Sequence, residues 1–317
     1  MRIVMLEPLG VSQENIESLS AALTSQGHEF IACGSRVEDT QELIRRSEGA
    51  DVLLLANLPL KGEVIRSVPN LKMISVAFTG IDHIDLEACR EKGVRICNAA
   101  GYSTHSVAEL AFGLMIAVYR YIVPCNTVTR EGKTKTGLIG NELYGKTLGI
   151  VGTGAIGMRV AEIGKAFGCK ILAYSRSQKQ EAKNLGITYV SLEELLSSSD
   201  IVTLHTPLNP ETKQLINKER IALMKPSAVL INTARGPVVD SEALAEALNE
   251  GRIAGAGIDV FEMEPPLPTD HVLLHSKNTV VAPHVAFATQ EALVRRAGIA
   301  FDNITALMDG NPKNVML

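Results

Sequence analysis

The sequence predicts an α/β protein with two domains, each built on a parallel β-sheet that helices cover. Length is the first reason, because 317 residues exceed what one ordinary hydrophobic core holds. The second is the alternation of short runs rich in Val, Ile and Leu with helical stretches along the whole chain. The third is that these runs are apolar at successive residues, as in strands whose two faces are both covered.

Two groups of apolar runs are predicted as strands. They lie at residues 2–6, 51–56, 71–77 and 94–97, and then at 147–152, 169–174, 200–205, 227–233, 254–259 and 278–283. The first domain boundary is therefore placed near Asn98–Gly101. The last strand ends at Pro283, and a final helix at Gln290–Asp309 is expected to return to the first domain. The two domains are predicted as residues 1–100 with 286–317, and residues 101–285.

A helix is predicted at His105–Tyr121, and it is apolar on every side. Such a helix has to be buried all round. An internal core helix satisfies this condition. A helix shared with a second copy of the chain satisfies it too, and we favour that reading, which makes the protein a homodimer.

Composition excludes several classes of partner. Hydrophobic residues make up 46% of the chain and charged residues 21%, as in an ordinary globular protein. The net charge is −4, and Lys and Arg are spread along the chain, so neither nucleic acid nor an anionic membrane surface is expected as a partner. The most apolar stretch, Val107–Tyr119, is shorter than the ~18–20 residues that span a bilayer.

The cysteines and the N-terminus both suit a cytosolic protein. The five cysteines form no CxxC pair and are odd in number, so we expect reduced core residues, without disulfides or a metal site. The first residues, MRIVMLEPLG, give a short apolar run closed by Pro and Gly. That pattern predicts a first strand, because a signal peptide needs a longer apolar stretch and a small-residue cleavage site.

A glycine-rich turn follows the strand at residues 147–152. Its residues are Gly152, Thr153, Gly154, Ala155, Ile156 and Gly157, and apolar residues at helical spacing come next. The first glycine permits the tight turn, and the second lets the backbone approach a pyrophosphate. The third allows the helix to pack closely on the strand. Because strand, turn and helix occur in the required order, this motif predicts a Rossmann-type dinucleotide site, with the pyrophosphate at the helix N-terminus.

The residues after the next strand bear on the choice between NAD and NADP. An enzyme specific for NAD carries Asp or Glu there to bind the ribose 2′-hydroxyl. This chain has Ser175, Arg176 and Ser177 instead. No carboxylate repels a 2′-phosphate, and the guanidinium with two hydroxyls suits one. We therefore favour NADP. The alternative is a solvated Arg176 and an NAD that binds without the acidic contact.

Polar residues follow several other strands, where ligands of parallel sheets bind. They are His205, Thr206 and Pro207, then Thr233, Ala234 and Arg235, then Asp259, and finally His284. Hydride transfer to a 2-oxo acid needs a cation to hold the carboxylate, an acid to protonate the alkoxide, and a group that keeps this acid charged. Arg235, His284 and Glu264 suit these roles, since a carboxylate beside an imidazole favours its charged form. His205 is the second choice of histidine, and position alone does not separate Glu262 from Glu264.

These residues resemble the D-2-hydroxyacid dehydrogenase family, which includes glyoxylate/hydroxypyruvate reductase, phosphoglycerate dehydrogenase and D-lactate dehydrogenase. The matching motifs span nearly the whole chain: residues 78–85, 107–109, 152–157, 233–236, 259–265 and 282–284. The resemblance implies Glu264, directly before Pro265, as the catalytic carboxylate, Arg235 as the substrate anchor and His284 as the acid/base.

The resemblance also implies the surrounding contacts. Asp259 is expected at the nicotinamide carboxamide, and Thr206, Pro207, Thr233 and Ala234 along the cofactor. Backbone N–H groups of Ala77, Phe78, Thr79 and Gly80 are expected at the substrate carboxylate, together with Arg235 and His284. Residues 1–100 with the last helix would then be the substrate domain, which closes on the cofactor across a hinge.

Two features bear on which family member the chain resembles. Ser175 stands where the family usually has Asp, which favours NADP, and the Ser-Arg-Ser turn and the length suit glyoxylate/hydroxypyruvate reductases. Phe287 is instead similar to D-lactate dehydrogenases, and there is no room for the regulatory domain of many phosphoglycerate dehydrogenases. We therefore predict a hydride transfer between NADP, or NAD, and a small 2-oxo or D-2-hydroxy acid. The alternatives are a phosphoglycerate or D-lactate dehydrogenase, a relative that oxidises formate or phosphite, and a cofactor-sensing binding protein of the same fold.

Overall fold

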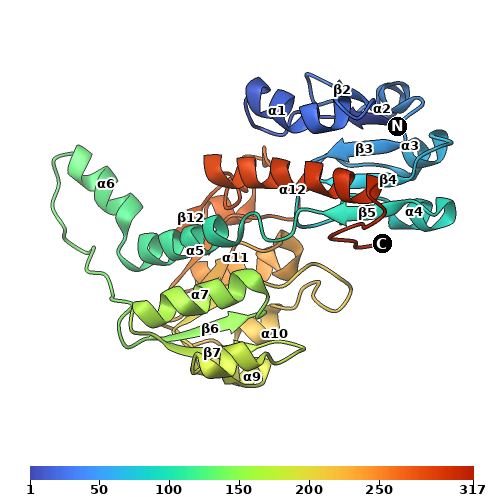
Figure 1. Cartoon of the computed structure of the whole chain (residues 1–317). Helices are drawn as coiled ribbons and strands as arrows, with labels where there is room; N and C mark the ends of the chain where they lie inside the picture. The colour runs from blue at the N-terminus through green and yellow to red at the C-terminus, as the bar shows by residue number, and fades with distance from the viewer. The chain divides into compact units, whose positions relative to one another are not determined.

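The computed structural model describes all residues from Met1 to Leu317 and divides into two compact units (Figure 1). The first unit holds Met1–Ser103 and Ala288–Leu317, and the second holds Thr104–Phe287. The first unit is thus made from both ends of the chain, and the second is continuous. Both are α/β units with purely parallel sheets, so the predicted fold class is confirmed.

The first unit contains a five-stranded parallel sheet in the order β2-β1-β3-β4-β5. Its strands are β1 (Arg2–Met5), β2 (Glu29–Ala32), β3 (Val52–Leu55), β4 (Met73–Val76) and β5 (Arg95–Asn98). Its helices are α1 (Gln13–Thr24), α2 (Thr40–Ser47), α3 (Gly62–Ser67), α4 (Leu86–Lys92) and α12 (Gln290–Met308). The order reverses between β1 and β3, and ligands of open α/β sheets usually bind beyond the carboxyl ends of the two strands at such a reversal.

Helix α12 is held on this sheet by apolar packing and by buried hydrogen bonds. Phe301 and Ile304 belong to the same core cluster as the residues of β1 and β3. The Ser75 hydroxyl in β4 donates to the carbonyl of Ala300 at 2.8 Å, and the Asn303 amide donates to the carbonyl of Asn98 at 2.8 Å. A segment more than 200 residues away in sequence therefore completes the core of the first unit.

The second unit contains a seven-stranded parallel sheet in the order β8-β7-β6-β9-β10-β11-β12. Its strands are β6 (Thr147–Val151), β7 (Lys170–Tyr174), β8 (Thr188–Tyr189), β9 (Ile201–Leu204), β10 (Val229–Asn232), β11 (Gly255–Ile258) and β12 (Thr279–Val281). Its helices are α5 (Thr104–Tyr119), α6 (Ile122–Arg130), α7 (Ala155–Ala166), α8 (Gln180–Asn184), α9 (Leu192–Ser198), α10 (Lys218–Ile221) and α11 (Ser241–Asn249), with 3₁₀ turns η1 (Gly236–Val238) and η2 (Val272–Leu274). Numbered from β6, this is the Rossmann order 3-2-1-4-5-6 with β12 added, and β6 and β9 flank the switch point.

Most helices begin at a polar residue whose side chain accepts a backbone N–H of the first turn. Ser12, Asp39, Asp85, Ser191, Asn217, Asp240 and Thr289 cap their helices in this way. Helix α7 differs, because it begins after Gly154 and has no side-chain cap. Its first N–H groups are therefore not occupied by a capping side chain of the protein.

Three elements differ from the sequence prediction. The edge strands β2 and β8 were not predicted, because β2 is only partly buried and β8 is two residues long, so neither gives a continuous apolar run. The helix predicted at 105–121 ends at Tyr119, and α6 begins after Tyr121 in the left-handed region. Most apolar side chains of α5 belong to the core of its own unit, so the internal core helix accounts for its apolar sides and a second copy is not needed to bury them. No single helix is both long and apolar enough to cross a membrane, and the α5–α6 pair that reaches this length and hydropathy is bent by 57°.

Candidate active site

The glycine-rich turn joins β6 to α7, and the structure requires glycine at two of its positions. Gly152 has a φ of 99°, and a Cβ there would lie 2.5 Å from the carbonyl oxygen of His205. A Cβ on Gly157 would collide with the carbonyl oxygen of Gly152. The turn, the start of α7 and the end of β9 are therefore packed backbone against backbone, which a larger residue prevents.

Gly154 has the opposite surroundings. A Cβ built on it meets no atom within 4 Å, and it begins α7 without a side-chain hydrogen bond. Open space at an uncapped helix N-terminus, with the N–H groups of Ala155 and Ile156 in the first turn, fits the pyrophosphate of a dinucleotide. Thr153 is buried, and its hydroxyl lies 2.9 Å from that of Tyr189, which fixes the turn to β8.

The turn after β7 carries Ser175, Arg176 and Ser177, as the sequence places them. The Arg176 guanidinium lies 3.2 Å from the Glu211 carboxylate, and both side chains are 71% exposed. An ion pair this exposed contributes little to stability, so the guanidinium can exchange this contact for another anion. The backbone N–H of Lys179 donates to the Tyr189 hydroxyl at 3.2 Å, which ties this turn to the same tyrosine as Thr153.

Further predicted cofactor residues follow β9 and β10. Thr206 and Pro207 come after β9, and the Pro207 carbonyl accepts a hydrogen bond from Thr212 at 2.6 Å. Thr233 follows β10 and is 7% exposed, yet its hydroxyl oxygen is buried without a hydrogen-bond partner. Buried polar atoms usually have partners. A buried hydroxyl without a protein partner, directly after a strand of this sheet, is what a site built for a polar ligand would leave.

Arg235 is held by the shape of the turn after β10. The Asn232 side chain accepts the N–H of Ala234 and donates to the carbonyl of Arg235, both at 3.0 Å. The guanidinium itself donates to the Ala234 carbonyl at 2.8 Å. Gly236, the next residue, packs directly on the backbone of Phe261, where a Cβ would collide. The turn that carries Arg235 is therefore fixed against the loop that carries Glu264.

His284 and Glu264 lie in direct contact. Nδ1 of His284 is 2.8 and 2.9 Å from the two carboxylate oxygens of Glu264. A carboxylate only accepts hydrogen bonds, so Nδ1 carries a hydrogen and the tautomer is fixed. The imidazole side chain is 12% exposed, and Phe287 meets its ring edge-on at 5.3 Å.

Asp259 shapes the loop that presents this histidine. Its side chain is fully buried, and its oxygens accept the N–H groups of Val285 and Ala286 at 2.8 and 2.9 Å. The N–H of His284 donates to the Asp259 carbonyl at 2.8 Å, and His284 has a φ of 57°. Burial raises the pKa of Asp259, while the two N–H donors oppose that rise. The contact of Asp259 with a nicotinamide carboxamide stays a prediction.

The two glutamates that sequence position left open have different partners. Glu264 contacts His284, whereas a Glu262 oxygen lies 3.2 Å from Nε2 of His271. Sequence reasoning did not identify His271 or Tyr189, because neither follows a strand directly at the carboxyl edge. Their proximity to Glu262 and Thr153 depends on loop geometry.

His205 is unsuited to the acid role. Its Nε2 lies 2.9 Å from the Thr203 hydroxyl, and burial lowers its pKa to about 3. The ring is therefore neutral near pH 7 and has no extra proton to donate to an alkoxide. Its backbone carbonyl instead packs closely against Gly152, in the glycine-rich turn.

The remaining predicted substrate residues lie in the first unit. Ala77, Phe78, Thr79 and Gly80 follow β4; the Ala77 N–H donates to Leu55, and the carbonyl of Thr79 accepts the Asn98 amide at 2.7 Å. Arg235, Glu264 and His284 belong to the second unit. Contact of the 77–80 loop with a substrate stays a prediction.

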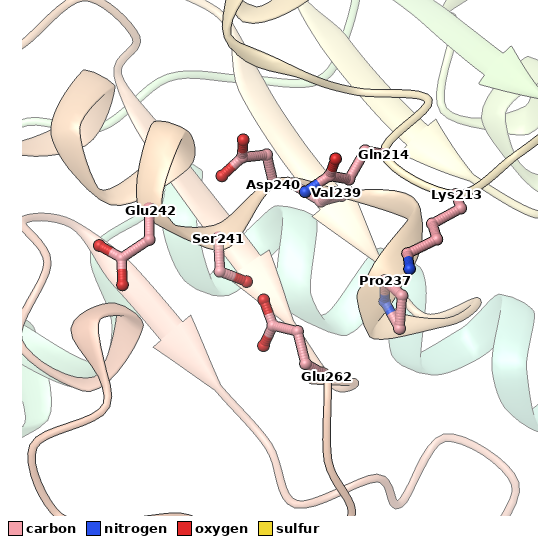
Figure 2. Close-up of a pocket in the computed structure, with 8 residues that line it drawn as sticks. All are labelled: Lys213, Gln214, Pro237, Val239, Asp240, Ser241, Glu242 and Glu262. Carbon is pink, nitrogen blue, oxygen red and sulfur yellow. The ribbon is translucent and has the colours of Figure 1, made fainter.

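A pocket of about 190 Å³ in the second unit contains none of the predicted catalytic residues (Figure 2). It is lined by Lys213, Gln214, Pro237, Val239, Asp240, Ser241, Glu242 and Glu262. Glu262 directs its carboxylate at the Ser241 oxygen there.

Comparison with known proteins gives the family. Residues 112–286 match the NAD-binding domain of D-isomer specific 2-hydroxyacid dehydrogenases. Glyoxylate reductase of Korarchaeum cryptofilum is 42% identical over 86% of this chain and 85% of its own. Hydroxypyruvate reductase of Blautia hydrogenotrophica is 34% identical over 100% and 99% of the two chains. The chain belongs to the D-isomer specific 2-hydroxyacid dehydrogenase family.

A solved structure agrees with this assignment. An acyclic imino acid reductase in complex with NADPH and D-Arg superposes with a TM-score of 0.90 at 29% identity, covering 100% of both chains. The chain is thus an NAD(P)-dependent oxidoreductase, which confirms that prediction. The family's nucleotide domain coincides with the unit that carries the glycine-rich turn.

We predict that His205→Gln reduces the acid sensitivity of the fold. Between its ordinary pKa of 6.5 and about 3, His205 takes up a proton when unfolded but not when folded. Its contribution to stability is therefore lost as the pH falls through that window. The drop in Tm from about pH 7 to about pH 5 should be smaller in His205→Gln than in the parent. The matched control is His105→Gln, at an exposed position of α5; equal drops in both variants would contradict the prediction.

We also predict that Gly154→Ala separates cofactor binding from folding. The added methyl group meets no protein atom, so the free energy of unfolding should change by less than ~1 kcal/mol. The same methyl group occupies the space in front of α7, so NADPH and NADH affinity should fall at least about tenfold. Gly34→Ala, which also meets no atom, is the control and should bind normally. Undiminished affinity in Gly154→Ala would exclude this turn as the pyrophosphate site.

Proposed function

We propose that the chain interconverts a small 2-oxo acid and its D-2-hydroxy acid, in the manner of a glyoxylate/hydroxypyruvate reductase. The observation that carries this proposal is the Glu264–His284 contact at 2.8 Å, placed after the last strand of a dinucleotide-binding sheet. Relatives named glyoxylate reductase and hydroxypyruvate reductase support the substrate class. A relative named D-3-phosphoglycerate dehydrogenase, from Methanocaldococcus jannaschii, is 38% identical over 98% of this chain, so phosphohydroxypyruvate is the alternative substrate.

His284 is proposed to move the proton. Glu264 keeps the hydrogen of the imidazole on Nδ1, so Nε2 is the nitrogen that gains and loses a proton. In the charged ring, Nε2 donates its proton to the oxygen that becomes the hydroxyl. In the neutral ring, Nε2 accepts that proton in the reverse direction. The nicotinamide ring, when bound, supplies or accepts the hydride at C2 of the acid.

Arg235 is proposed to hold the carboxylate of the acid. A guanidinium binds a carboxylate through two parallel hydrogen bonds, which fixes the orientation of C2 as well as its position. Asn232 and Gly236 keep the turn in one conformation, so little ordering is needed when substrate binds. Backbone N–H groups of residues 77–80 are the second proposed anchor.

NADP is proposed as the preferred cofactor. Ser175 leaves no carboxylate at the position that binds the ribose 2′-hydroxyl in NAD enzymes, and the exposed Arg176 guanidinium suits a 2′-phosphate. The imino acid reductase of similar structure is in complex with NADPH. Thr206, Pro207, Thr233 and Ala234 would lie along the rest of the cofactor, and Asp259 near its carboxamide.

A cytosolic homodimer is the proposed assembly. Helix α6 has no buried residue, and it exposes half of the surface of Ile122 and Val123. In Figure 1 it extends away from the sheet of its unit. The linker after it exposes 85% of Ile139, and exposed apolar groups of this size favour contact with a second chain. All five cysteines are free thiols, which suits a reducing compartment.

The proposed function is tested by initial rates of NADPH and NADH oxidation, measured separately. The substrates are glyoxylate, hydroxypyruvate, pyruvate, a branched 2-oxo acid and phosphohydroxypyruvate. We expect the highest kcat/KM with glyoxylate or hydroxypyruvate and NADPH. A best substrate of pyruvate or phosphohydroxypyruvate would move the assignment to the D-lactate or phosphoglycerate type. No rate with any acid would refute the proposed reaction.

Cofactor preference has its own test in Arg176→Ala. Loss of a charge-assisted contact to the 2′-phosphate should lower kcat/KM for NADPH roughly 10- to 100-fold and leave that for NADH nearly unchanged. Lys183→Ala removes another exposed cation of the same unit, in α8, and should change neither value. An equal fall with both cofactors, or a parent enzyme that prefers NADH, would overturn the NADP assignment.

A further inference from the structure

We propose that Glu262 and His271 form a second carboxylate–imidazole pair, which positions Glu264 for its contact with His284. Neither residue is expected to touch substrate or cofactor, so both are positioning residues. The proposal deepens the proposed function and rests on it, because it takes Glu264 as the partner of the acid/base His284.

The geometry of the pair defines the direction of its hydrogen bonds. Nδ1 of His271 accepts the backbone N–H of Leu273 at 3.3 Å, so the ring hydrogen lies on Nε2. Nε2 donates to a Glu262 oxygen at 3.2 Å. The His271 side chain is only 10% exposed, and its ring meets Phe261 edge-on at 5.3 Å and 82°. The imidazole ring is therefore held by a hydrogen bond at each nitrogen and by its edge-on contact with Phe261.

Glu262 is fixed in turn by helix α11. Figure 2 shows the Ser241 oxygen directed at the Glu262 carboxylate, and Ser241 is the first residue of that helix. Burial alone would raise the pKa of Glu262, but hydrogen bonds from Ser241, from its own N–H and from His271 more than offset this, and the pKa lies below its usual value. The side chain is therefore an ionised carboxylate that accepts from two elements at once.

These contacts close the loop that carries the proposed catalytic carboxylate. Glu262 and His271 lie at its two ends, and Glu264 lies between them with its side chain 65% exposed. Burial does little to hold a side chain this exposed, so its position follows the backbone of the loop. A hydrogen bond to an ionised carboxylate is stronger than one between neutral groups, so the pair restricts the loop between its two members.

The same loop is coupled to the turn of the proposed substrate anchor. Phe261, directly before Glu262, packs its backbone on Gly236, directly after Arg235. The His271 ring packs on Phe261 as well. A pair that holds Glu262 and Phe261 therefore keeps two proposed catalytic groups in one arrangement. Productive geometry in active sites depends on such supporting contacts.

The test compares Glu262→Ala with Glu262→Gln, Glu264→Gln and the double variant Glu262→Ala/Glu264→Gln. Glu262→Ala should lower kcat about tenfold and leave the KM for the cofactor unchanged, because the acid/base geometry changes and the glycine-rich turn does not. Glu262→Gln should recover most of kcat, since an amide can still accept from His271 and contact Ser241. In the Glu264→Gln background, Glu262→Ala should lower kcat by less than about twofold, because the contact it positions is already altered.

The matched control is Glu242→Ala, which removes another carboxylate of the same pocket and should leave kcat unchanged. If Glu262→Ala does not fold, Ser241→Ala replaces it. This variant removes one hydrogen bond to Glu262, and its kcat is compared in the same way, with and without Glu264→Gln. Thermal melts accompany every variant. A lowered Tm with unchanged kcat in Glu262→Ala would show a purely structural pair and overturn the proposal. A double variant whose loss of kcat equals the product of the losses in Glu262→Ala and Glu264→Gln would also overturn it. An unchanged kcat in Glu264→Gln would instead refute the proposed role of Glu264 itself.

Discussion

The arrangement of the candidate site depends on one buried carboxylate, that of Asp259. It lies at the end of β11 with no exposed surface, and burial of a charge is costly unless hydrogen bonds compensate it. The N–H groups of Val285 and Ala286 provide that compensation. The chain after β12 has to curl around the end of β11 to offer them, and it does so with His284 in the left-handed region. The histidine is thus presented by a backbone conformation that would be unfavourable without the buried acid.

Glycines make the rest of this edge compact. Gly152 and Gly157 let the first turn of α7 and the end of β9 meet backbone to backbone, and Gly236 does the same between the Arg235 turn and Phe261. Contacts of this kind transmit shifts directly, because no flexible side chain separates the segments. The glycine-rich turn is therefore packed on the end of β9, and the Arg235 turn is packed on the loop that carries Glu264.

Much of this could be predicted from sequence, because the signals are local. Fully covered parallel strands give continuous apolar runs, and the order of strand, glycine turn and helix is readable in a few residues. The edge strands β2 and β8 lack such runs, since one is partly exposed and the other very short. Helix α6 was missed for a related reason: it has no buried face, and periodicity reports only a buried face.

What sequence could not provide was the pairing of side chains across loops. Glu262 and Glu264 are two residues apart, and only the path of the chain after β11 separates their partners, His271 and His284. The resemblance to a family pointed to Glu264 before any geometry was known, but it left Glu262 without a role. Tyr189 is similar, because its hydroxyl joins the glycine-rich turn to the turn of Arg176 from a strand too short to predict.

His205 and His284 both follow strands, and they show that the surroundings of a histidine, more than its position after a strand, decide whether it suits a proton donor. Both follow apolar strands of the same sheet and both contact a hydrogen-bonding partner. His205 meets the neutral hydroxyl of Thr203 in a buried setting, where its charged form has no counter-charge and its pKa falls to about 3. His284 meets a carboxylate that is itself 65% exposed, so a counter-charge lies within hydrogen-bond distance of its ring. A proton donor at this edge therefore requires the loop between β11 and β12, which carries Glu264, as much as it requires the imidazole.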